Sequence, residues 1–297
     1  MSTKKEWMNQ LRRELQLRHY APSTIVTYTG CLGVILNKYH QYNGYKSIED
    51  IKDFLLKEPR TQAYHKSCTA TFHHFFEKVI KKPLSLDDIP YPRPTHFLTQ
   101  ILSLQELQRF FAAIHNIKHL AIFKTIYFGA LRISEVTNII CRAGLSHIDS
   151  HRKTLLVKGA KGYKDRYVHL PADTITLLRN YYSQYKPKYW LFEGQAGDKY
   201  SKRSIQLIFQ RTCKKAGIHK RVTPHSLRHS RATHLLEAGI KGGIYALKEL
   251  LGHNNIKTTE IYLHLSTQSL VDSIELADMY IAKALQGNKE LKLEMAV

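Results

Sequence analysis

Four prolines lie between positions 83 and 94, in the stretch KKPLSLDDIPYPRPTHFL, and they divide the 297-residue chain into two parts. Proline fixes its φ angle and has no backbone N–H, so a segment this rich in proline favours an extended linker over a helix. A chain of this length can bury one large core or two ordinary ones. We therefore expect one domain over residues 1–92, a linker over 93–98 and a second domain over 99–297.

The first part carries apolar residues at helical spacing, which predicts an all-helical domain. The second helix should begin after Pro22, with Ser23 and Thr24 as possible caps. The third opens on a Ser-x-x-Asp sequence at Ser47 that is close to a capping box. The expected helical segments are WMNQLRRELQLR, IVTYTGCLGVILNKYHQY, SIEDIKDFLLKE and RTQAYHKSCTATFHHFFEKVI.

The second part mixes helical segments with one β-prone segment. Ser103 is placed to cap a helix over LSLQELQRFFAAIHN. In KTLLVKGAKGYKDRYVHLP, two β-prone runs flank a turn-rich sequence, which predicts a β-hairpin. Helical spacing returns after Asp173. The expected fold class is therefore mainly α, with a helical N-terminal domain and a mixed, mostly helical C-terminal domain containing a small antiparallel sheet.

The charge of the chain indicates what it binds. Lys and Arg number 45 against 24 Asp and Glu, a formal net charge of +21. Residues 1–97 hold 15 basic and 9 acidic side chains, and residues 98–297 hold 30 and 15, so both parts are basic. Such an excess is typical of nucleic-acid binding, because each basic contact to a phosphate releases a condensed counterion. A solubility charge and attraction to an anionic membrane are the alternatives.

Other features favour a protein of the cytoplasm. The N-terminus is charged and is followed by no apolar stretch, so no signal peptide is expected. The longest apolar run, near Leu120 to Leu131, is too short to span a bilayer. The four cysteines form no C-x-x-C pair, which fits a reducing compartment.

Residues 223–262 place four chemically capable side chains close together in sequence. His225 and Arg228 are three apart at the start of an expected helix, so both can reach one bound group. His253 follows in a Gly-His-Asn-Asn turn, and Tyr262 comes nine residues later. A tyrosine beside arginine and histidine suggests a nucleophile with a phosphate clamp, although tyrosine is more often a residue at the edge of a core. The expected helix is delimited by Thr223, Pro224 and Gly239.

Further candidates lie earlier in the second part. Arg132 precedes Glu135 by three residues, and a carboxylate there can orient a guanidinium for bidentate phosphate binding. A plain surface ion pair is the alternative for these two residues. In the hairpin, Lys161 and Lys164 lie in the turn and Lys158 on the strand before it. Lysines there can be merely solvated, or one could protonate a leaving oxygen.

The sequence predicts no metal and no cofactor. His225, His229 and His234 could suggest zinc, but the glutamate of an H-E-x-x-H motif and a third ligand are missing. No P-loop, G-x-G-x-x-G or two-metal carboxylate pattern is present, so nothing supports a dependence on ATP or Mg²⁺.

Five motifs together resemble the tyrosine recombinase/phage integrase family, in order and at similar spacing: GALRISEV, AKGYKDRYVHL, TPHSLRHSRATHLL, LLGHNN and TTEIYLH. The resemblance is to Xer-type recombinases and to integron or transposon integrases. APSTIVTY and TATFHHFFEKV look like that family's helical, SAM-like core-binding domain, and PRPTHFLTQILSLQEL looks like its interdomain linker.

Carried over motif by motif, the resemblance implies a complete catalytic set. Glu135 would support the first arginine, and Lys158 and Lys164 are fallback positions for the hairpin lysine. The chain departs from the family at Arg231, where an aromatic or apolar residue is usual and where an arginine could add a DNA contact, and in a Gly-rich segment before His253. The implied catalytic residues are Arg132, Lys161, His225, Arg228, His253 and the nucleophile Tyr262.

The family's chemistry implies metal-free phosphoryl transfer on double-stranded DNA, held in a clamp formed by both domains. Tyr262 would form a 3′-phosphotyrosyl bond, Lys161 would protonate the 5′-oxygen, and His225 would accept the tyrosine proton. His253 would donate a hydrogen bond to the phosphate. A homotetramer, a Holliday junction, a C-terminal tail docked on a neighbouring subunit and a nucleoid location follow by the same resemblance, and an accessory recombination-directing protein is possible.

Three other classes stay open at this point. A DNA-binding regulator without chemistry would keep the basic surface but would not need the whole catalytic set. A type IB topoisomerase-like enzyme would share the nucleophile and act as a monomer. A transposase or resolvase of a mobile element would use the same chemistry on other DNA partners.

Overall fold

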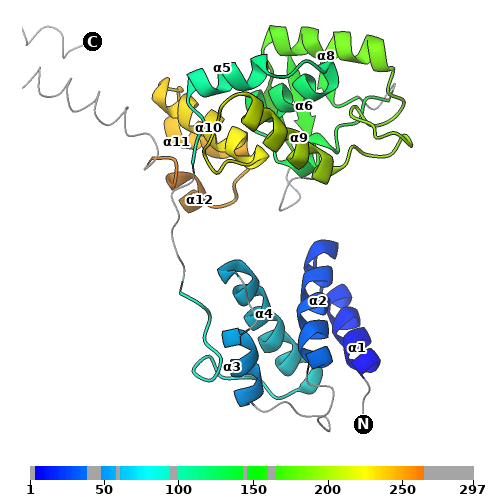
Figure 1. Cartoon of the computed structure of the whole chain (residues 1–297), viewed down its shortest axis with the longest axis vertical. Helices are drawn as coiled ribbons and strands as arrows, with labels where there is room; N and C mark the ends of the chain where they lie inside the picture. Colours follow the sequence, from blue (N-terminus) through cyan, green and yellow to red (C-terminus); the bar gives the residue numbers. More distant parts are fainter. Residues whose placement is uncertain are drawn as a thin grey trace, which may run out of the picture. The chain divides into compact units, whose positions relative to one another are not determined.

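The computed structural model describes residues 4–38, 48–57, 61–93, 100–142, 146–159 and 165–263. The chain forms two compact units, Met1–His96 and Phe97–Val297, drawn in Figure 1. Each unit has a hydrophobic core of its own. The two are described separately below.

The first unit is helical, as the apolar spacing predicts. Buried Leu11, Leu32, Phe54 and Phe72 bring its helices together. The second helix begins at Pro22 itself, so Ser23 and Thr24 lie inside its first turn and do not cap it. The expected cap at Ser47 lies outside the described residues. The elements are α1 (Lys4–Leu17), α2 (Pro22–Lys38), α3 (Ile48–Lys57), α4 (Gln62–Phe75) and a π-helical turn η1 (Phe76–Ile80).

The second unit is built around α6, a helix that packs against both α8 and α10. Phe110, Phe123 and Phe209 meet in its core with ring centroids 5.0–5.8 Å apart. The helices are α5 (Leu104–Ala112), α6 (Ile117–Phe128), α7 (Ile133–Val136), α8 (Ala172–Tyr185), α9 (Lys202–Lys215), α10 (Pro224–Glu237), α11 (Gly243–Leu251) and α12 (Lys257–Glu260).

The predicted hairpin is confirmed and belongs to a three-stranded antiparallel sheet in the order β1-β2-β3. Its strands are β1 (Ile148–Asp149), β2 (Thr154–Val157) and β3 (Arg166–His169). Leu155 pairs with Val168 and both are buried, whereas Arg166 opens β3 opposite Val157. The fold is thus mainly helical with a small antiparallel sheet, which confirms the expected class.

Local capping signals place two helices of the second unit as predicted. Ser103 and Glu106 form a reciprocal capping box at the start of α5. Thr223 precedes α10, whose first residue is Pro224, and Gly239 follows its end with φ +66°. Among the described residues, none of the helices has both the length and the apolar character to cross a membrane.

Candidate active site

Glu135 lies at the centre of the candidate site, on the short helix α7. The chain turns sharply after α6, with Ala130 at φ +48°, and Arg132 then takes the cap position of α7. The backbone N–H of Arg132 donates to Glu135 Oε2 at 2.8 Å, and its Nη1 donates to Oε1 at 2.8 Å. The same carboxylate therefore holds both the backbone and the guanidinium of Arg132, whose side chain stays 23% exposed.

Two more arginines reach the same carboxylate. Arg166, from β3, donates from Nη1 to Oε1 at 3.0 Å and from Nη2 to Oε2 at 2.9 Å. Arg228, from α10, has Nη1 3.7 Å from Oε2. Burial alone would raise the pKa of Glu135, which is 6% exposed, but the hydrogen bond and charge of Arg166 and the other arginines lower it to about 2. Glu135 is therefore ionised at neutral pH.

Arg228 is 1% exposed and is held by main-chain oxygens. Its Nη1 donates to the carbonyl of Ala130 and its Nη2 to the carbonyl of Leu251, both at 2.6 Å. Burial and then the nearby Arg132 lower its pKa to about 10, so it remains charged at neutral pH. These contacts join α10 to the end of α6 and the end of α11.

His253 follows α11 and contacts Arg228 on one side and Thr259 on the other. Its Nε2 lies 3.2 Å from Arg228 Nη2, and its Nδ1 lies 3.0 Å from Thr259 Oγ1. A guanidinium can only donate, so Nε2 accepts and the ring carries its proton on Nδ1. Burial and the charge of Arg228 lower the pKa of His253 to about 4, which keeps the ring neutral.

Tyr262 is 1% exposed, and its ring is stacked at 10° on His253, with centroids 6.5 Å apart. Its hydroxyl lies 2.9 Å from Nδ1 of His229. Burial raises the pKa of Tyr262 despite the opposing charge of Arg228, and burial lowers the pKa of His229 to about 4. The tyrosine is thus protonated and paired with a neutral histidine.

His225 lies beside His229, but His229 is the histidine that contacts the Tyr262 hydroxyl. The rings of His225 and His229 are edge to face, with centroids 4.5 Å apart. Desolvation, and then the charges of Arg228 and Arg132, lower the pKa of His225. The histidine at the tyrosine hydroxyl is therefore His229, four residues after the one favoured by the sequence.

Of the three hairpin lysines, the structure describes one, Lys158. Lys161 and Lys164 lie outside the described residues. Lys158 is exposed and directly follows β2. Gly159 N–H donates to Asp165 Oδ1 at 3.1 Å, so the two ends of the loop that carries the lysines are tied together.

The structure thus brings together residues from four separate segments: Arg132, Glu135, Arg228, His253 and Tyr262. His225 contacts His229, which in turn contacts Tyr262. Sequence reasoning missed Arg166 and considered His229 only as a zinc ligand. Arg166 stands in the hairpin motif that the sequence analysis had already recognised. A buried Glu135 needs positively charged partners, and this need was the signal that could have identified Arg166. The signal for His229 was its place one turn after His225.

Two of the histidines once considered for zinc have other partners here. His229 is bonded to Tyr262, and His234 Nδ1 lies 3.0 Å from the hydroxyl of Tyr127. Over the described part of the chain, no group of three His, Cys, Asp or Glu side chains is placed to hold a metal ion.

Arg231 lies against two aromatic rings of α6. Its guanidinium carbon lies 5.5 Å from the ring centre of Tyr127 and 5.4 Å from that of Phe128. Stacking of this kind stabilises an arginine against aromatic faces. The departure at this position therefore has a packing explanation within α6 and α10.

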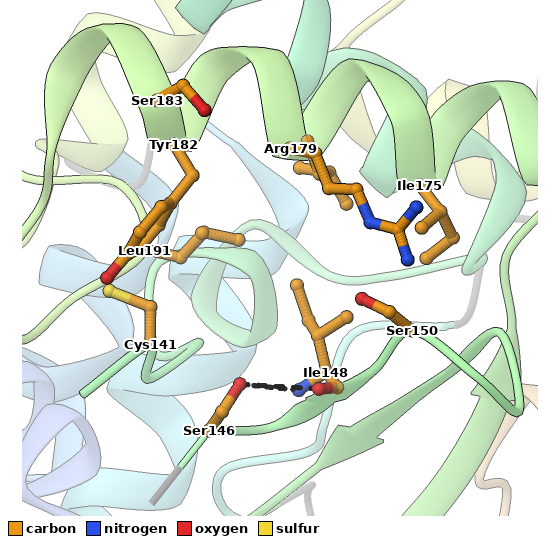
Figure 2. A pocket seen from close by; sticks show the side chains of 10 residues that line it. Cys141, Ser146, Ile148, Ser150, Ile175, Arg179, Tyr182, Ser183 and Leu191 are labelled. Atoms are coloured by element: carbon orange, nitrogen blue, oxygen red, sulfur yellow. Dashed lines mark hydrogen bonds between the residues drawn. The ribbon is translucent and has the colours of Figure 1, made fainter. Parts of the chain in front are cut away.

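A cavity of about 440 Å³ lies elsewhere in the second unit (Figure 2). Arg179 and Tyr182 project into it from α8, opposite Ile148 of β1 and Cys141. None of the candidate catalytic residues that the structure describes lines this cavity.

Comparison with known proteins shows which family the chain resembles. Residues 100–269 match the model of the Phage integrase family. The chain is 30% identical over 268 residues to a putative integrase/recombinase of Sinorhizobium fredii, covering 88% of this chain and 85% of that one. It is 29% identical over 289 residues to the tyrosine recombinase XerA of Thermococcus kodakarensis, covering 94% and 98%.

Solved structures share the fold at lower identity. The XerH recombinase bound to a palindromic difH substrate superposes with a TM-score of 0.67 at 19% identity, covering 94% of this chain and 86% of that chain. The Tn1549 transposon integrase in complex with transposon right end DNA gives 0.68 at 17% identity, covering 91% and 98%.

Fold, site and relatives together define the class: this is a tyrosine-type site-specific recombinase. The chain belongs to the Phage integrase family.

Proposed function

We propose that this recombinase cuts and rejoins double-stranded DNA at specific sites, with Tyr262 as nucleophile. The single observation that carries this assignment is the convergence of Arg132 and Arg228 on Glu135, beside a tyrosine paired with a neutral histidine. Arg132, whose side chain is 23% exposed, can meet an oxygen of a phosphodiester, and the buried Arg228 adds fixed positive charge behind it. Preorganised charge of this kind stabilises the transition state.

The proposed reaction breaks one P–O bond and forms another. The Tyr262 oxygen attacks the scissile phosphorus, the bond to the 5′-oxygen breaks, and a 3′-phosphotyrosyl bond and a free 5′-hydroxyl result. Lys161 supplies the proton that the departing 5′-oxygen needs. Attack by a 5′-hydroxyl of another strand reverses the step, so the bond energy is conserved and no nucleotide cofactor is required.

The tyrosine proton goes to a histidine. The distance of 2.9 Å favours His229 as the first acceptor, and His225, with its ring centroid 4.5 Å from that of His229, is next in line. His225→Phe and His229→Phe variants separate the two: the variant of the true acceptor should slow single-turnover cleavage about 10²-fold or more.

Two adjustments accompany phosphate binding in this proposal. Tyr262 is 1% exposed, so the segment after α12 must shift before its oxygen can reach a duplex. His253 Nε2 accepts from Arg228 here, so donation to a phosphate requires its proton to move from Nδ1 to Nε2.

A synaptic assembly is part of the proposal. The lambda integrase has been solved as a tetramer bound to a Holliday junction, and its fold matches this chain with a TM-score of 0.67 at 16% identity, covering 86% of this chain and 78% of that chain. We extend to this chain a tetramer on two DNA sites, exchanging strands through a Holliday junction. Docking of the tail beyond Tyr262 on a neighbouring subunit belongs to the same proposal.

The test begins by selecting bound DNA from a random duplex library with the Tyr262→Phe protein. The selected site is then synthesised with single nicks stepped along it, so that a short 5′-hydroxyl strand leaves after cleavage and any covalent complex accumulates. Wild type should give a protein–DNA adduct on a denaturing gel, labelled only from the strand 5′ of the cut. Tyr262→Phe should give none.

Other outcomes identify the alternatives. Tight binding without any adduct would contradict catalysis and indicate a regulator. Relaxation of plasmids that lack the site would indicate a topoisomerase-like activity. Sequencing of the joined products distinguishes chromosome-type resolution from the transposase or resolvase of a mobile element.

A further inference from the structure

Arg166 is a buried arginine to which no step of the proposed reaction assigns a task. It opens β3, directly after the loop that carries the hairpin lysines, and its side chain is 8% exposed. Its Nε donates to the carbonyl of Leu250 at 2.8 Å, and its two terminal nitrogens donate to the two oxygens of Glu135 at 3.0 and 2.9 Å. Each of its three nitrogens therefore donates a hydrogen bond inside the protein.

The geometry of these bonds requires arginine. The two parallel N–H···O bonds to Glu135 use the planar fork of the guanidinium, which a lysine ammonium cannot reproduce. The third bond, to Leu250, leaves from Nε. Arg166 thus fixes the carboxylate and a helix end at the same time.

Arg166 and Arg228 act on neighbouring carbonyls at the end of α11. Arg166 donates a hydrogen bond to the carbonyl of Leu250, and Arg228 donates one to the carbonyl of Leu251. The residues that follow are Gly252 and His253. A Cβ added at Gly252 would lie 3.1 Å from Nη1 of Arg166, so the chain passes Arg166 closely at this point. The turn that presents His253 is therefore positioned by Arg166 as well as by Arg228.

We propose that Arg166 is a positioning residue of the recombination reaction: it fixes Glu135 and the end of α11, and so sets the orientation of Arg132 and of the turn bearing His253 toward the scissile phosphate. The inference rests on the proposed function. It extends that function by adding a third arginine that works through other residues and does not touch DNA.

The charged and titratable groups around Glu135 determine what removal of Arg166 does. Arg132 faces it from α7, Arg166 from β3, and Arg228 and His225 from α10. Without Arg166 the buried carboxylate keeps Arg132 and the more distant Arg228, so its pKa rises. A protonated Glu135 accepts fewer hydrogen bonds and holds Arg132 less firmly, so the defect grows as the pH falls.

The test compares Arg166→Met, Arg166→Lys and a control, Arg179→Met, which removes an exposed arginine of α8. Single-turnover adduct formation is measured on the selected nicked DNA between pH 5 and 8, beside DNA affinity and thermal unfolding. Arg166→Met should slow adduct formation about 10²-fold at pH 8 and more at pH 5.5, with affinity within about threefold of wild type. Arg166→Lys should recover part of the rate, and Arg179→Met should match wild type.

Two results would overturn the inference while leaving the proposed function intact. One is wild-type cleavage by Arg166→Met. The other is a loss in that variant that is equal at every pH and is matched by lost affinity and a collapsed unfolding transition, which is the pattern of a merely structural residue.

If wild type itself forms no adduct, the proposed function is rejected. The role of Arg166 can then still be tested by a measurement that needs no DNA. The Glu135 carboxyl is followed by NMR with ¹³C-labelled glutamate in wild type and in Arg166→Lys. Its titration should move to higher pH in the variant. An unchanged titration would refute the role given to Arg166.

Discussion

Glu135 is a buried carboxylate whose ionised form depends on the arginines around it. Its pKa falls from 4.5 to about 2 because the hydrogen bond and charge of Arg166 and the other arginines outweigh the opposing effect of burial. A group with a lowered pKa stabilises the fold above its unfolded value, and that contribution is lost as the pH falls through the folded value. The shift corresponds to a free energy on the order of 3 kcal/mol.

We expect Glu135→Gln to remove this dependence on pH. Urea unfolding of wild type should lose stability between about pH 5 and pH 2, and the variant should lose about 3 kcal/mol less over the same interval. At pH 7 the variant should be the less stable protein, because three arginines lose their buried counter-charge. Parallel curves for the two proteins would contradict the assignment.

His229 and His253 are kept neutral by burial, with pKa values lowered from 6.5 to about 4. We expect their ring resonances in NMR to titrate near pH 4. The unfolded chain then binds more protons between about pH 6.5 and 4, so this pair lowers stability as the pH falls through that window.

The control for this titration is Tyr262→Phe. That variant removes the hydroxyl at His229 but keeps the ring that buries it, so His229 should still titrate near pH 4. Titration of either histidine near 6.5 in wild type would show that the pocket is open to solvent.

At the residue scale, the sequence predicted the parts of the site that are local or lie within recognised motifs. Glu135 lies three residues from Arg132, so their contact is local, between the cap position and the third residue of α7. The contact of Arg166 with Glu135 spans 31 residues, and that of His229 with Tyr262 spans 33. Such contacts form only when segments far apart in the sequence have packed together, and no rule of sequence spacing predicts them.

At the scale of elements, the end of α11 depends on Gly252. Its φ is +63°, and an added Cβ would lie 3.1 Å from Arg166 Nη1. Gly239, after α10, has a similar φ of +66° but open space around the Cβ position. Substitution of either glycine by a residue with a Cβ therefore strains the backbone, but only at Gly252 does it also produce a steric clash.

We expect Gly239→Ala to cost about 1 kcal/mol in the free energy of unfolding, and Gly252→Ala about 2–3 kcal/mol. Only Gly252→Ala should also slow adduct formation, since it displaces Arg166 and the turn of His253. Urea denaturation of both variants measures the difference. Equal costs would mean that Arg166 moves aside freely.

Elements with strong local signals were predicted well. Ser103 placed the start of α5, and Thr223 with Pro224 placed the start of α10. Strand β1 was missed because its two residues are too few to show alternation. The expected segment began at Ile25, three residues after the observed start of α2 at Pro22, because proline is favoured at the first helical position and was treated as preceding the helix.

At the scale of the whole molecule, each unit has its own core and its own positive charge. Residues 1–97 hold 15 basic and 9 acidic side chains, against 30 and 15 in residues 98–297. The assignment of 93–98 as a linker between independent domains stays a prediction. We expect a fragment of residues 97–297 to unfold cooperatively and to bind the selected DNA more weakly than the full chain.

The salt dependence of binding reports the share of each unit. The slope of log K against log salt grows with the number of phosphates neutralised. The fragment should therefore show a shallower slope than the full chain. An identical slope would mean that the first unit makes no phosphate contacts.

The central claim is that Tyr262 becomes covalently attached to DNA. The most direct measurement is protease digestion of the trapped complex, followed by nuclease trimming and mass spectrometry of the modified peptide. We expect one nucleotide-bearing peptide, with the mass added as a 3′-phosphodiester on Tyr262. Attachment at any other residue, or no modified peptide from a complex that survives denaturation, would contradict the claim.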